Sequence, residues 1–405
     1  MSNIPKLRFP EFNGEWEEKK LSDIASFSKG KGYTKNDLVN DGSPIILYGR
    51  MYTKYETVIS DIDTFVNLQE GSIISKGGEI IVPASGETAE EISRASVVKN
   101  KGIILGGDLN IISLQKDKYN PEFFALTISS GTSQKRLSKL AQGKSVVHLH
   151  NEDLSGLQIK VPTLAEQQKI ADFLSNVDSI ITAETKILKT LQKKKKALMQ
   201  KLFTRQLRFK SDDGTDFPAW EEKKLGEISS SPKYGLNASG IDYDGEHKYL
   251  RITDIDEVTH TFSPEEITTP SEFSDDYLLE ENDIVFARTG ASTGKTYLYN
   301  PNDGDLYFAG FLIKFHIKDA NARFVFYQTC THEYEKWVHV MSTRSGQPGI
   351  NSEEYSTLKI KLPCIEEQQK IADCLSIMDS LIQTQQKVVT TWQQRKKALL
   401  QQMFI

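Results

Sequence analysis

The sequence has few cysteines, no long apolar run and no start typical of an exported protein. Cys330, Cys364 and Cys374 are its only cysteines among 405 residues, and no two of them form a C-x-x-C pair, which predicts reduced thiols in a cytoplasm. No apolar run approaches the roughly 20 residues that span a bilayer. The N-terminal segment contains no continuous apolar stretch followed by a small-residue cleavage site. We therefore expect a soluble, cytoplasmic protein with no membrane partner.

An excess of basic charge is also missing. The formal net charge is -5 and the isoelectric point is near 5.9, which argues mildly against a nucleic-acid partner because binding to phosphates needs a local excess of Lys and Arg. Net charge is an average, however, and an acidic protein can still carry a basic groove. The length allows two or more domains, each with its own core.

Recognisable catalytic motifs are absent as well. The seven histidines include no H-E-x-x-H, and the chain contains no G-x-S-x-G, no G-x-G-x-x-G that opens a helix, and no N-P-P-Y or D-P-P-Y run. His148 and His150 alternate on an expected strand, where ordinary packing is favoured over metal binding. We expect no catalytic residue, no metal and no cofactor, and therefore a protein that is not an enzyme.

A long segment of the sequence occurs twice. Residues 162–203 align without gaps to residues 363–404, with 22 of 42 positions identical, and the shorter run WEEKKL occurs at 16–21 and at 220–225. The chain is therefore two tandem units, each a variable block followed by a similar segment. The expected divisions are a first block at 1–161, a helix at 162–203, a second block at 204–362 and a helix at 363–405.

Both repeated segments have the pattern of long helices. After Pro162 and Pro363 they contain no further proline and no glycine, and apolar residues recur at heptad spacing. Polar residues interrupt both patterns at matching places, Glu184 and Lys195 in one and Gln385 and Lys396 in the other. This favours an intramolecular coiled coil, antiparallel if the units are related by an approximate two-fold axis. The alternative is that each helix docks on its own block.

The two variable blocks predict α+β domains with mixed sheets. Short apolar runs separated by Gly, Asn and Asp indicate strands, for example at 79–83 and 283–288, and one helix per block is expected near 121–130 and 322–338. The blocks share a layout but differ in their loops. The sequence PASGETAE begins at Pro83, the last residue of the first of these runs, whereas RTGASTGK begins at Arg288, the last residue of the second. This pattern is typical of modules that recognise different versions of one kind of ligand.

The run ARTGASTGKT at 287–296 is close to a phosphate-binding loop but does not fit one. A P-loop has four residues between its glycines, whereas three separate Gly290 from Gly294. A short strand is expected after Thr296 in place of a helix, and the first block has no corresponding lysine. We expect no triphosphate here. The glycines, hydroxyls and the charges of Arg288 and Lys295 suit a nucleic-acid backbone, and arginine can also grip guanine. The alternative is a solvated β-turn.

Taken with these motifs, the chain resembles the DNA specificity subunits of type I restriction-modification systems. The resemblance covers nearly the whole chain, and its most specific elements are WEEKKL, LQIKVPTLAEQQKIADFLSNVD, LKIKLPCIEEQQKIADCLSIMD, ARTGASTGK and RSGQPGIN. It implies two target-recognition domains joined by two conserved helices packed as a coiled coil. It also implies that each domain binds one half of a split double-stranded DNA target, and that two adenine methyltransferase subunits and the restriction and translocase subunits are partners.

The resemblance also implies where DNA is contacted. In the first block these positions are Lys29, Lys31, Tyr33, Ser85, Thr88 and Lys144. In the second they are Tyr234, Arg251, Thr253, Asp254, Arg288, Thr289, Ser292, Lys295, Arg344 and Gln347. The loop PASGETAE departs from the family's basic form. Two other classes of function stay open: an enzyme with an unrecognised nuclease or nucleotide site around 283–296, and a coiled-coil scaffold that makes no DNA contact.

Overall fold

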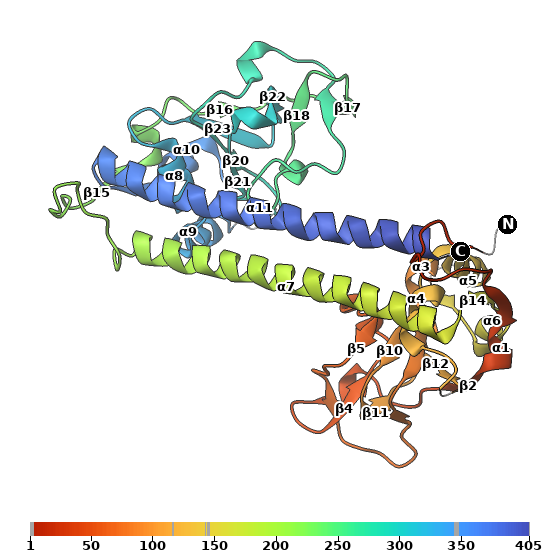
Figure 1. Ribbon diagram of the computed structural model, residues 1–405. Helices are drawn as coiled ribbons and strands as arrows, with labels where there is room; N and C mark the ends of the chain where they lie inside the picture. The colour runs from red at the N-terminus through yellow and green to blue at the C-terminus, as the bar shows by residue number, and fades with distance from the viewer. Residues whose placement is uncertain (1–3, 116, 142, 144–145, 344–347, 405) are drawn as a thin grey trace. The chain divides into compact units, whose positions relative to one another are not determined.

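In the computed structural model, the repeated segments form two long helices, α7 (Leu164–Phe203) and α11 (Ile365–Met403), as their heptad pattern predicts (Figure 1). The structure describes residues 4–115, 117–141, 143, 146–343 and 348–404. It divides into two compact units, a first unit of Met1–Lys186 with Gln386–Ile405 and a second unit of Ile187–Gln385. Each unit thus combines one variable block with a stretch of both helices. None of the described helices combines the length and apolarity needed to cross a membrane.

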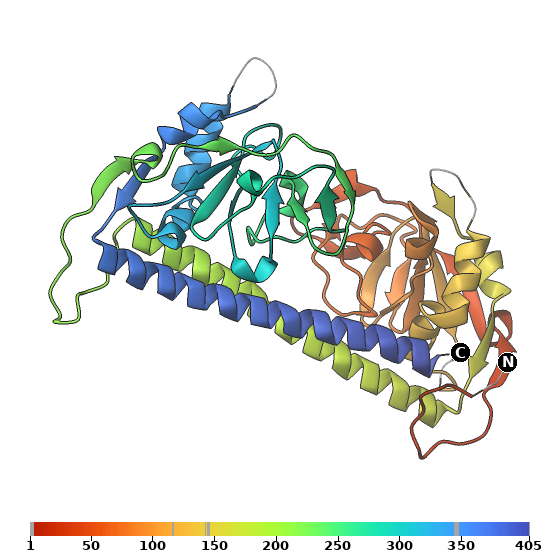
Figure 2. The same ribbon diagram turned by 90° about the horizontal axis from the view of Figure 1, so that it is seen from above.

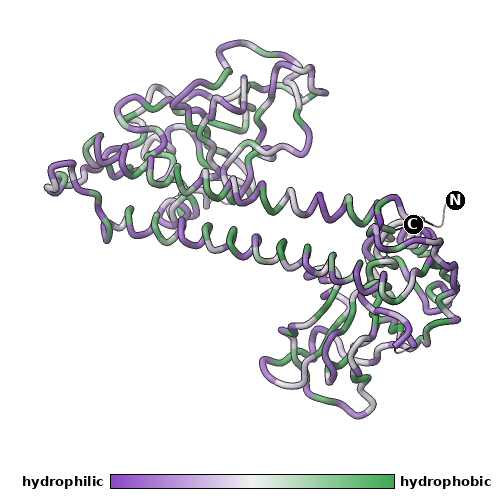
Figure 3. The backbone as a smooth tube through the Cα atoms, viewed as in Figure 1, coloured by the Kyte–Doolittle hydropathy of each residue, from purple (hydrophilic) through white to green (hydrophobic). Residues whose placement is uncertain are grey.

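The two helices pair antiparallel within each unit. In the first unit, Lys396 near the end of α11 places its Nζ 2.5 Å from Oδ1 of Asp178 in the first half of α7. In the second unit, Lys195 near the end of α7 has the same 2.5 Å contact with Asp379 of α11. Within each unit the two helices run beside each other in opposite directions (Figure 2), and hydrophobic and hydrophilic residues alternate along each of them (Figure 3). The lysines that interrupt the two heptad patterns are therefore paired with aspartates of the opposite helix.

The start of each helix also docks on its own block, so the two expected arrangements coexist. Ile170 and Leu174 belong to the core of the first block, and Ile371 and Leu375 belong to the core of the second. Near their ends, Met199 and Leu202 of α7 belong to the core of the second block, and Met403 of α11 belongs to the core of the first. Further buried apolar residues of the two helices include Val177, Leu188, Ile382 and Val389.

The described part of the first block is a mixed α+β domain. One sheet has the order β2 (Ala25–Lys29), β12 (Leu109–Leu114), β8 (Glu79–Pro83), β10 (Ser96–Val98), β5 (Val58–Ile59), and another has β3 (Leu38–Val39), β6 (Phe65–Val66), β4 (Ser43–Ile46), β11 (Lys101–Leu105), β7 (Ile74–Lys76). The pairs β10–β5 and β11–β4 are parallel. Two further pairs are β1 (Glu17–Lys20) with β14 (Gln158–Val161) and β9 (Ser85–Gly86) with β13 (Val147–His148). The helices of this block are α1 (Leu21–Ile24), α2 (Arg50–Thr53), α3 (Ala89–Ile92), α4 (Pro121–Ile128), α5 (Gly131–Leu140) and α6 (Asn151–Ser155), with a 3₁₀ turn η1 (Lys35–Asp37).

The described part of the second block has the same class of fold with a smaller central sheet. That sheet has the order β16 (Lys233–Tyr234), β23 (Leu312–His316), β20 (Asp283–Ala287), β21 (Thr296–Leu298). Three two-stranded pairs are β15 (Glu221–Lys224) with β24 (Lys359–Leu362), β17 (Gly240–Asp242) with β19 (Thr268–Pro270), and the parallel pair β18 (Lys248–Leu250) with β22 (Leu306–Phe308). The helices are α8 (Ala322–Gln328), α9 (His332–Ser342) and α10 (Ser352–Ser356), and the 3₁₀ turns are η2 (Leu225–Glu227), η3 (Ile252–Asp254), η4 (Asp275–Tyr277) and η5 (Pro301–Asp303).

The expectation of one helix per block was wrong. Two consecutive helices occur at each place, α4 and α5 in the first block and α8 and α9 in the second. In the second block the chain leaves α8 at Thr329, and Thr331 caps the start of α9 by accepting a hydrogen bond from the backbone N–H of Tyr334. In the first block α5 begins at Gly131, whose φ of 59° breaks the helical path after α4. Capping by threonine and the left-handed glycine therefore divide what reads as one helical run.

The repeated sequence motifs anchor each long helix to its block. In the first unit the buried carboxylate of Glu166 lies 2.7 Å from both Nε and Nη2 of Arg8, and it accepts the indole N–H of Trp16 at 3.3 Å. The second unit repeats this arrangement at 3.0, 2.6 and 3.1 Å with Glu367, Arg208 and Trp220. Trp16 and Trp220 open the two WEEKKL runs, so the duplicated sequences meet each other at the helix starts.

The glutamines of the EQQ runs complete this anchor. The side chain of Gln167 accepts a hydrogen bond from the backbone N–H of Asn120 at 3.0 Å and donates to the carbonyl of Pro162 at 2.8 Å. Gln368 makes the same two contacts, at 2.9 and 2.8 Å, in the second unit. Asn120 in turn caps α4, since its side chain accepts the N–H of Phe123. The helix starts are thus tied to buried polar groups of the blocks, which are costly to leave unpaired.

Candidate nucleic-acid interface

The loop that resembles a phosphate-binding loop is a tight hairpin between β20 and β21. The backbone N–H of Ala287 donates to the carbonyl of Lys295 at 2.8 Å, and the N–H of Gly294 donates back to Ala287 at 2.9 Å. Gly290 and Gly294 have φ values of 75° and 92°, which suit glycine. The expectation that a strand follows Thr296 is confirmed by its pairing with Phe286. The loop therefore lacks the helix N-terminus that receives phosphate in a P-loop.

Gly294 holds this hairpin against helix α9, and we predict that Gly294→Ala destabilises it. A Cβ at this position would lie 2.5 Å from Cγ1 of Val338, and the φ of 92° disfavours any side chain. Such overpacking and backbone strain cost about 1–3 kcal/mol each. Denaturant unfolding should show the loss, and Gly245→Ala, which also has positive φ but no atom within 4 Å, isolates the strain alone. Equal effects of the two substitutions would contradict the close-packing account.

The loop that follows the central strand of each block, 84–88 after β8 and 288–295 after β20, is paired with a second segment in the same way. In the second block Thr289 forms an antiparallel bridge with Gly349, and the N–H of Ile350 donates to the carbonyl of Arg288 at 2.9 Å. In the first block Ser85 pairs with His148. Strands β8 and β20 lead into these loops from equivalent positions of their sheets. The two blocks therefore present different side chains on one backbone frame.

Arg288 and Tyr234 come together at this frame although 54 residues separate them in the sequence. The guanidinium carbon of Arg288 lies 4.8 Å from the centroid of the Tyr234 ring, within the range of a cation–π contact. Tyr234 is exposed, and its hydroxyl lies 3.1 Å from Oγ of Ser352. Ser352 was not among the predicted site residues. The arrangement presents a fixed arginine beside an exposed aromatic ring, which suits phosphate or base contacts.

Lys295, in contrast, turns back into the second block. Its ammonium lies 3.1 Å from the carbonyl oxygen of Ile255 and 3.4 Å from a carboxylate oxygen of Glu257, and the side chain is only 11% exposed. It was expected to supply charge to a ligand, whereas in the structure it fastens the hairpin to the segment that follows η3. Thr289 and Ser292 are half-buried on the same loop.

The predicted group of Arg251, Thr253 and Asp254 forms a self-contained ion pair. The guanidinium of Arg251 donates to Asp254 from Nε at 2.9 Å and from Nη2 at 2.8 Å, and this hydrogen bonding raises the pKa of Arg251. The hydroxyl of Thr253 lies 3.3 Å from the same carboxylate. Asp254 is 2% exposed, and its carboxylate orients Arg251. Arg251 keeps an exposed fraction of 38%.

In the first block, Lys29 and Lys31 are exposed at the end of β2, while Tyr33 is tied down. The hydroxyl of Tyr33 lies 2.6 Å from Oγ of Ser72 and accepts the backbone N–H of Gln69 at 2.9 Å. Tyr33 therefore holds the 67–72 loop, and the neighbouring lysines are the groups available to a ligand.

The other predicted positions of this block lie around β9. Ser85 belongs to β9 itself, and Thr88 caps α3 by accepting the N–H of Glu91 at 3.2 Å. Gly86 lies so close to Tyr52 that a Cβ there would be 2.7 Å from the tyrosine hydroxyl. Three predicted positions, Lys144, Arg344 and Gln347, lie outside the described residues.

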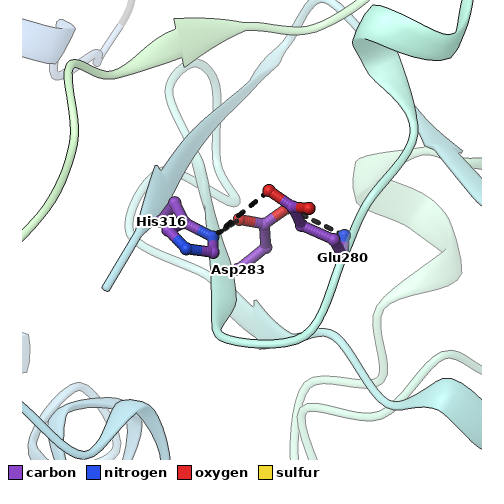
Figure 4. Close-up of side chains that lie close together, drawn as sticks. All are labelled: Glu280, Asp283 and His316. Carbon is purple, nitrogen blue, oxygen red and sulfur yellow. Dashed lines mark hydrogen bonds and ion pairs between the residues drawn. The ribbon is translucent and has the colours of Figure 1, made fainter. Parts of the chain in front are cut away.

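One cluster of possible metal ligands was not predicted, and it is an ion-pair group. Glu280, Asp283 and His316 bring their ligand atoms within 4.8 Å of one another (Figure 4). The fully buried Asp283 accepts from Nδ1 of His316 at 3.0 Å, and Nζ of Lys314 lies 3.1 Å from its other oxygen. Burial raises the pKa of Asp283. The Lys314 cation balances this carboxylate. The corresponding residue of the first block, Glu79 at the start of β8, accepts the backbone N–H groups of Lys76 and Gly77 instead. In the structure the buried Asp283 is thus engaged with Lys314 and His316.

These features belong to a known protein family. Residues 13–193 and 219–391 match the family described as Type I restriction modification DNA specificity domain. The two ranges cover most of the chain, so the chain belongs to this family, with one match in each half. It is a specificity subunit of the type I restriction-modification class, whose function is the recognition of DNA sequence.

Named relatives span nearly the same length. The chain is 27% identical over 415 residues to the type I restriction enzyme MjaVIII specificity subunit of Methanocaldococcus jannaschii, covering 97% of this chain and 92% of that protein. It is 23% identical over 417 residues to the StySPI specificity subunit of Salmonella potsdam, covering 95% and 87%.

Solved structures show the same fold at lower identity. The crystal structure of a type I restriction-modification S subunit from M. genitalium matches with a TM-score of 0.64 at 16% identity, covering 99% of both chains. A chain from a structure on complex assembly and conformational transition of the type I R-M system matches with a TM-score of 0.56, covering 95% of this chain and 96% of that one.

Proposed function

We propose that each block reads one half of a split double-stranded DNA target and that the helices α7 and α11 set the distance between the halves. The observation that carries this proposal is the shared loop frame, in which Thr289 bridges Gly349 and Ser85 pairs with His148 while the exposed side chains differ. A common frame with exchanged side chains is what two readers of different half-sites require. Each well-read base pair adds about 1–3 kcal/mol of discrimination.

The proposed contacts in the second block centre on Arg288, with Tyr234 beneath its guanidinium and Thr289 and Ser292 on the same loop. Arg251 is held in place by Asp254 and keeps an exposed fraction for a phosphate contact. In the first block the proposed contacts are Lys29, Lys31 and the β9 segment. Lys295, Tyr33 and Asp254 support these positions from within the blocks.

We further propose that the chain acts without catalytic residues of its own. Two adenine methyltransferase subunits would dock on it and modify the bound target, and restriction and translocase subunits would join that assembly. A structural relative comes from work on complex assembly of the type I R-M system, which supports partners of this kind. Two alternatives remain distinguishable by experiment. An enzyme would turn over DNA or nucleotide as the purified chain alone, and a pure scaffold would show no salt-sensitive, sequence-selective DNA binding in the presence of its partners.

The decisive experiment exchanges residues 204–362 for the corresponding block of a related specificity subunit. The exchanged chain is expressed with its methyltransferase partners, and methylated adenines are mapped across genomic DNA by single-molecule sequencing. We expect one half of the methylated sequence to change and the other half to stay, because the first block is untouched. A second chain with one heptad inserted in each helix, near residues 190 and 384, should change only the spacing. A change of both halves after the exchange would contradict the proposal.

A further inference from the structure

Two histidines form an ordered, exposed pair beside the loop that follows β8 in the first block. The rings of His148 and His150 are parallel within 3°, with centroids 6.4 Å apart, and both side chains are exposed. Nδ1 of His148 lies 3.2 Å from Oγ of Ser85 on the paired strand β9. His148 lies on β13 and His150 is the N-cap residue of α6. Packing does not account for the two rings, because neither ring is buried.

The backbone that carries the two rings is fixed from several sides. Leu149, which lies between them, is fully buried, and its N–H donates to the carbonyl of Ala84 at 3.1 Å. The fully buried side chain of Asn110 donates from Nδ2 to the carbonyl of Leu149 at 2.8 Å. Asn151 donates in the same way to Ser28 at 3.0 Å, directly before Lys29 at the end of β2. Exposed side chains on a backbone held in this way are preorganised for a ligand.

The second block places different groups at the equivalent positions of this frame. Gly349, which bridges Thr289, stands where the first block has His148, and it offers no side chain. The second block instead has Arg288 at the strand end where the first block has Ala84. At this frame the large polar side chain thus comes from different sides in the two blocks. In the first block it is His148 of β13, and in the second it is Arg288 at the end of β20. Positions that differ between two copies of one frame are those expected to set specificity.

We propose that His148 and His150 are specificity-determining residues that contact base edges in the half-site read by the first block. This inference rests on the proposed reading of DNA by that block. A neutral imidazole has one donor and one acceptor, and with Nδ1 facing Ser85 the other nitrogen of His148 is left for a base. The ring separation of 6.4 Å is close to two steps along a DNA strand of about 3.4 Å each. The two rings therefore address different base pairs of one half-site.

The test uses the full chain with its methyltransferase partners and three variants, His148→Ala, His150→Ala and the double substitution. Genomic DNA modified by each complex is sequenced to map the methylated adenines. We expect each single substitution to relax the base preference at one position of one half-site at least about fivefold. The double variant should relax both positions, while the other half-site keeps its sequence. Arg288→Ala should relax that other half-site.

A matched control is His332→Ala, because His332 is an exposed histidine at the start of α9 that pairs with Glu335. It should leave both half-sites unchanged. The inference is overturned if the double variant keeps both half-sites intact. It is also overturned if methylation falls uniformly with base preferences unchanged, since that result assigns the histidines to backbone contact or to stability. A failure of the proposed function itself looks different: the unsubstituted chain would then direct no two-part methylated sequence.

Discussion

The full chain carrying Glu166→Ala is expected to lose about 3–5 kcal/mol of unfolding free energy in the first unit. The carboxylate of Glu166 is 1% exposed and receives the guanidinium of Arg8 through two 2.7 Å contacts, together with the indole N–H of Trp16. Removing it leaves a partly buried guanidinium and an indole donor without their acceptor. In thermal unfolding of the full chain, the transition of the first unit should fall by on the order of 10 °C.

Two controls separate the buried network from ordinary charge effects. Glu11→Ala removes an exposed carboxylate that contacts Lys169 at 3.2 Å and should leave the transition where it is. The double variant Arg8→Met with Glu166→Met replaces the ion pair by apolar side chains of similar length and should recover most of the loss. If the double variant is as unstable as Glu166→Ala, the unpaired arginine is not the cause.

Much of the architecture could be predicted because it depends on local and repeated patterns. The heptads without glycine or proline predicted α7 and α11, and the runs at 79–83 and 283–288 predicted the central strands β8 and β20. The partners of Lys195 and Lys396 could not be read in this way. Their pairing with Asp379 and Asp178 depends on the register of an antiparallel helix pair, which no local pattern determines.

The candidate site was only partly readable for the same reason. The glycine spacing and the strand after Thr296 excluded a phosphate-binding loop, since both features are local. The direction of a side chain depends on distant neighbours: Lys295 turns inward because the carbonyl of Ile255 lies within 3.1 Å, and Tyr33 is held by the 67–72 loop. His148 and His150 were assigned to packing. The signal that could have singled them out is the alignment of the segments that end at Pro162 and Pro363, which places Gly349 opposite His148 and Asn351 opposite His150.

Arg288→Ala is expected to weaken recognition of one half-site by roughly tenfold to a hundredfold, which corresponds to about 1–3 kcal/mol. The guanidinium of Arg288 lies over the ring of Tyr234, whose hydroxyl is fixed by Ser352. An arginine held in this way loses little side-chain entropy when it binds. Binding of the assembled complex to DNA with one half-site varied at a time should show the loss in that half-site only. Tyr234→Ala should give a smaller loss in the same half-site, because Arg288 remains but is less fixed.

Two further variants decide whether this effect belongs to recognition. Arg323→Ala removes an exposed arginine on α8 that lies 3.8 Å from Asp373, and it should leave DNA binding unchanged. Lys295→Met removes a cation of the same loop that is engaged with Ile255 and Glu257. It should lower the stability of the second unit more than it alters base preference. The two substitutions Lys295→Met and Arg288→Ala could instead relax the preference for the same base pairs equally. That result would mean that the ammonium of Lys295 leaves Ile255 to contact DNA. The assignment of direct contact to Arg288 alone would then be wrong.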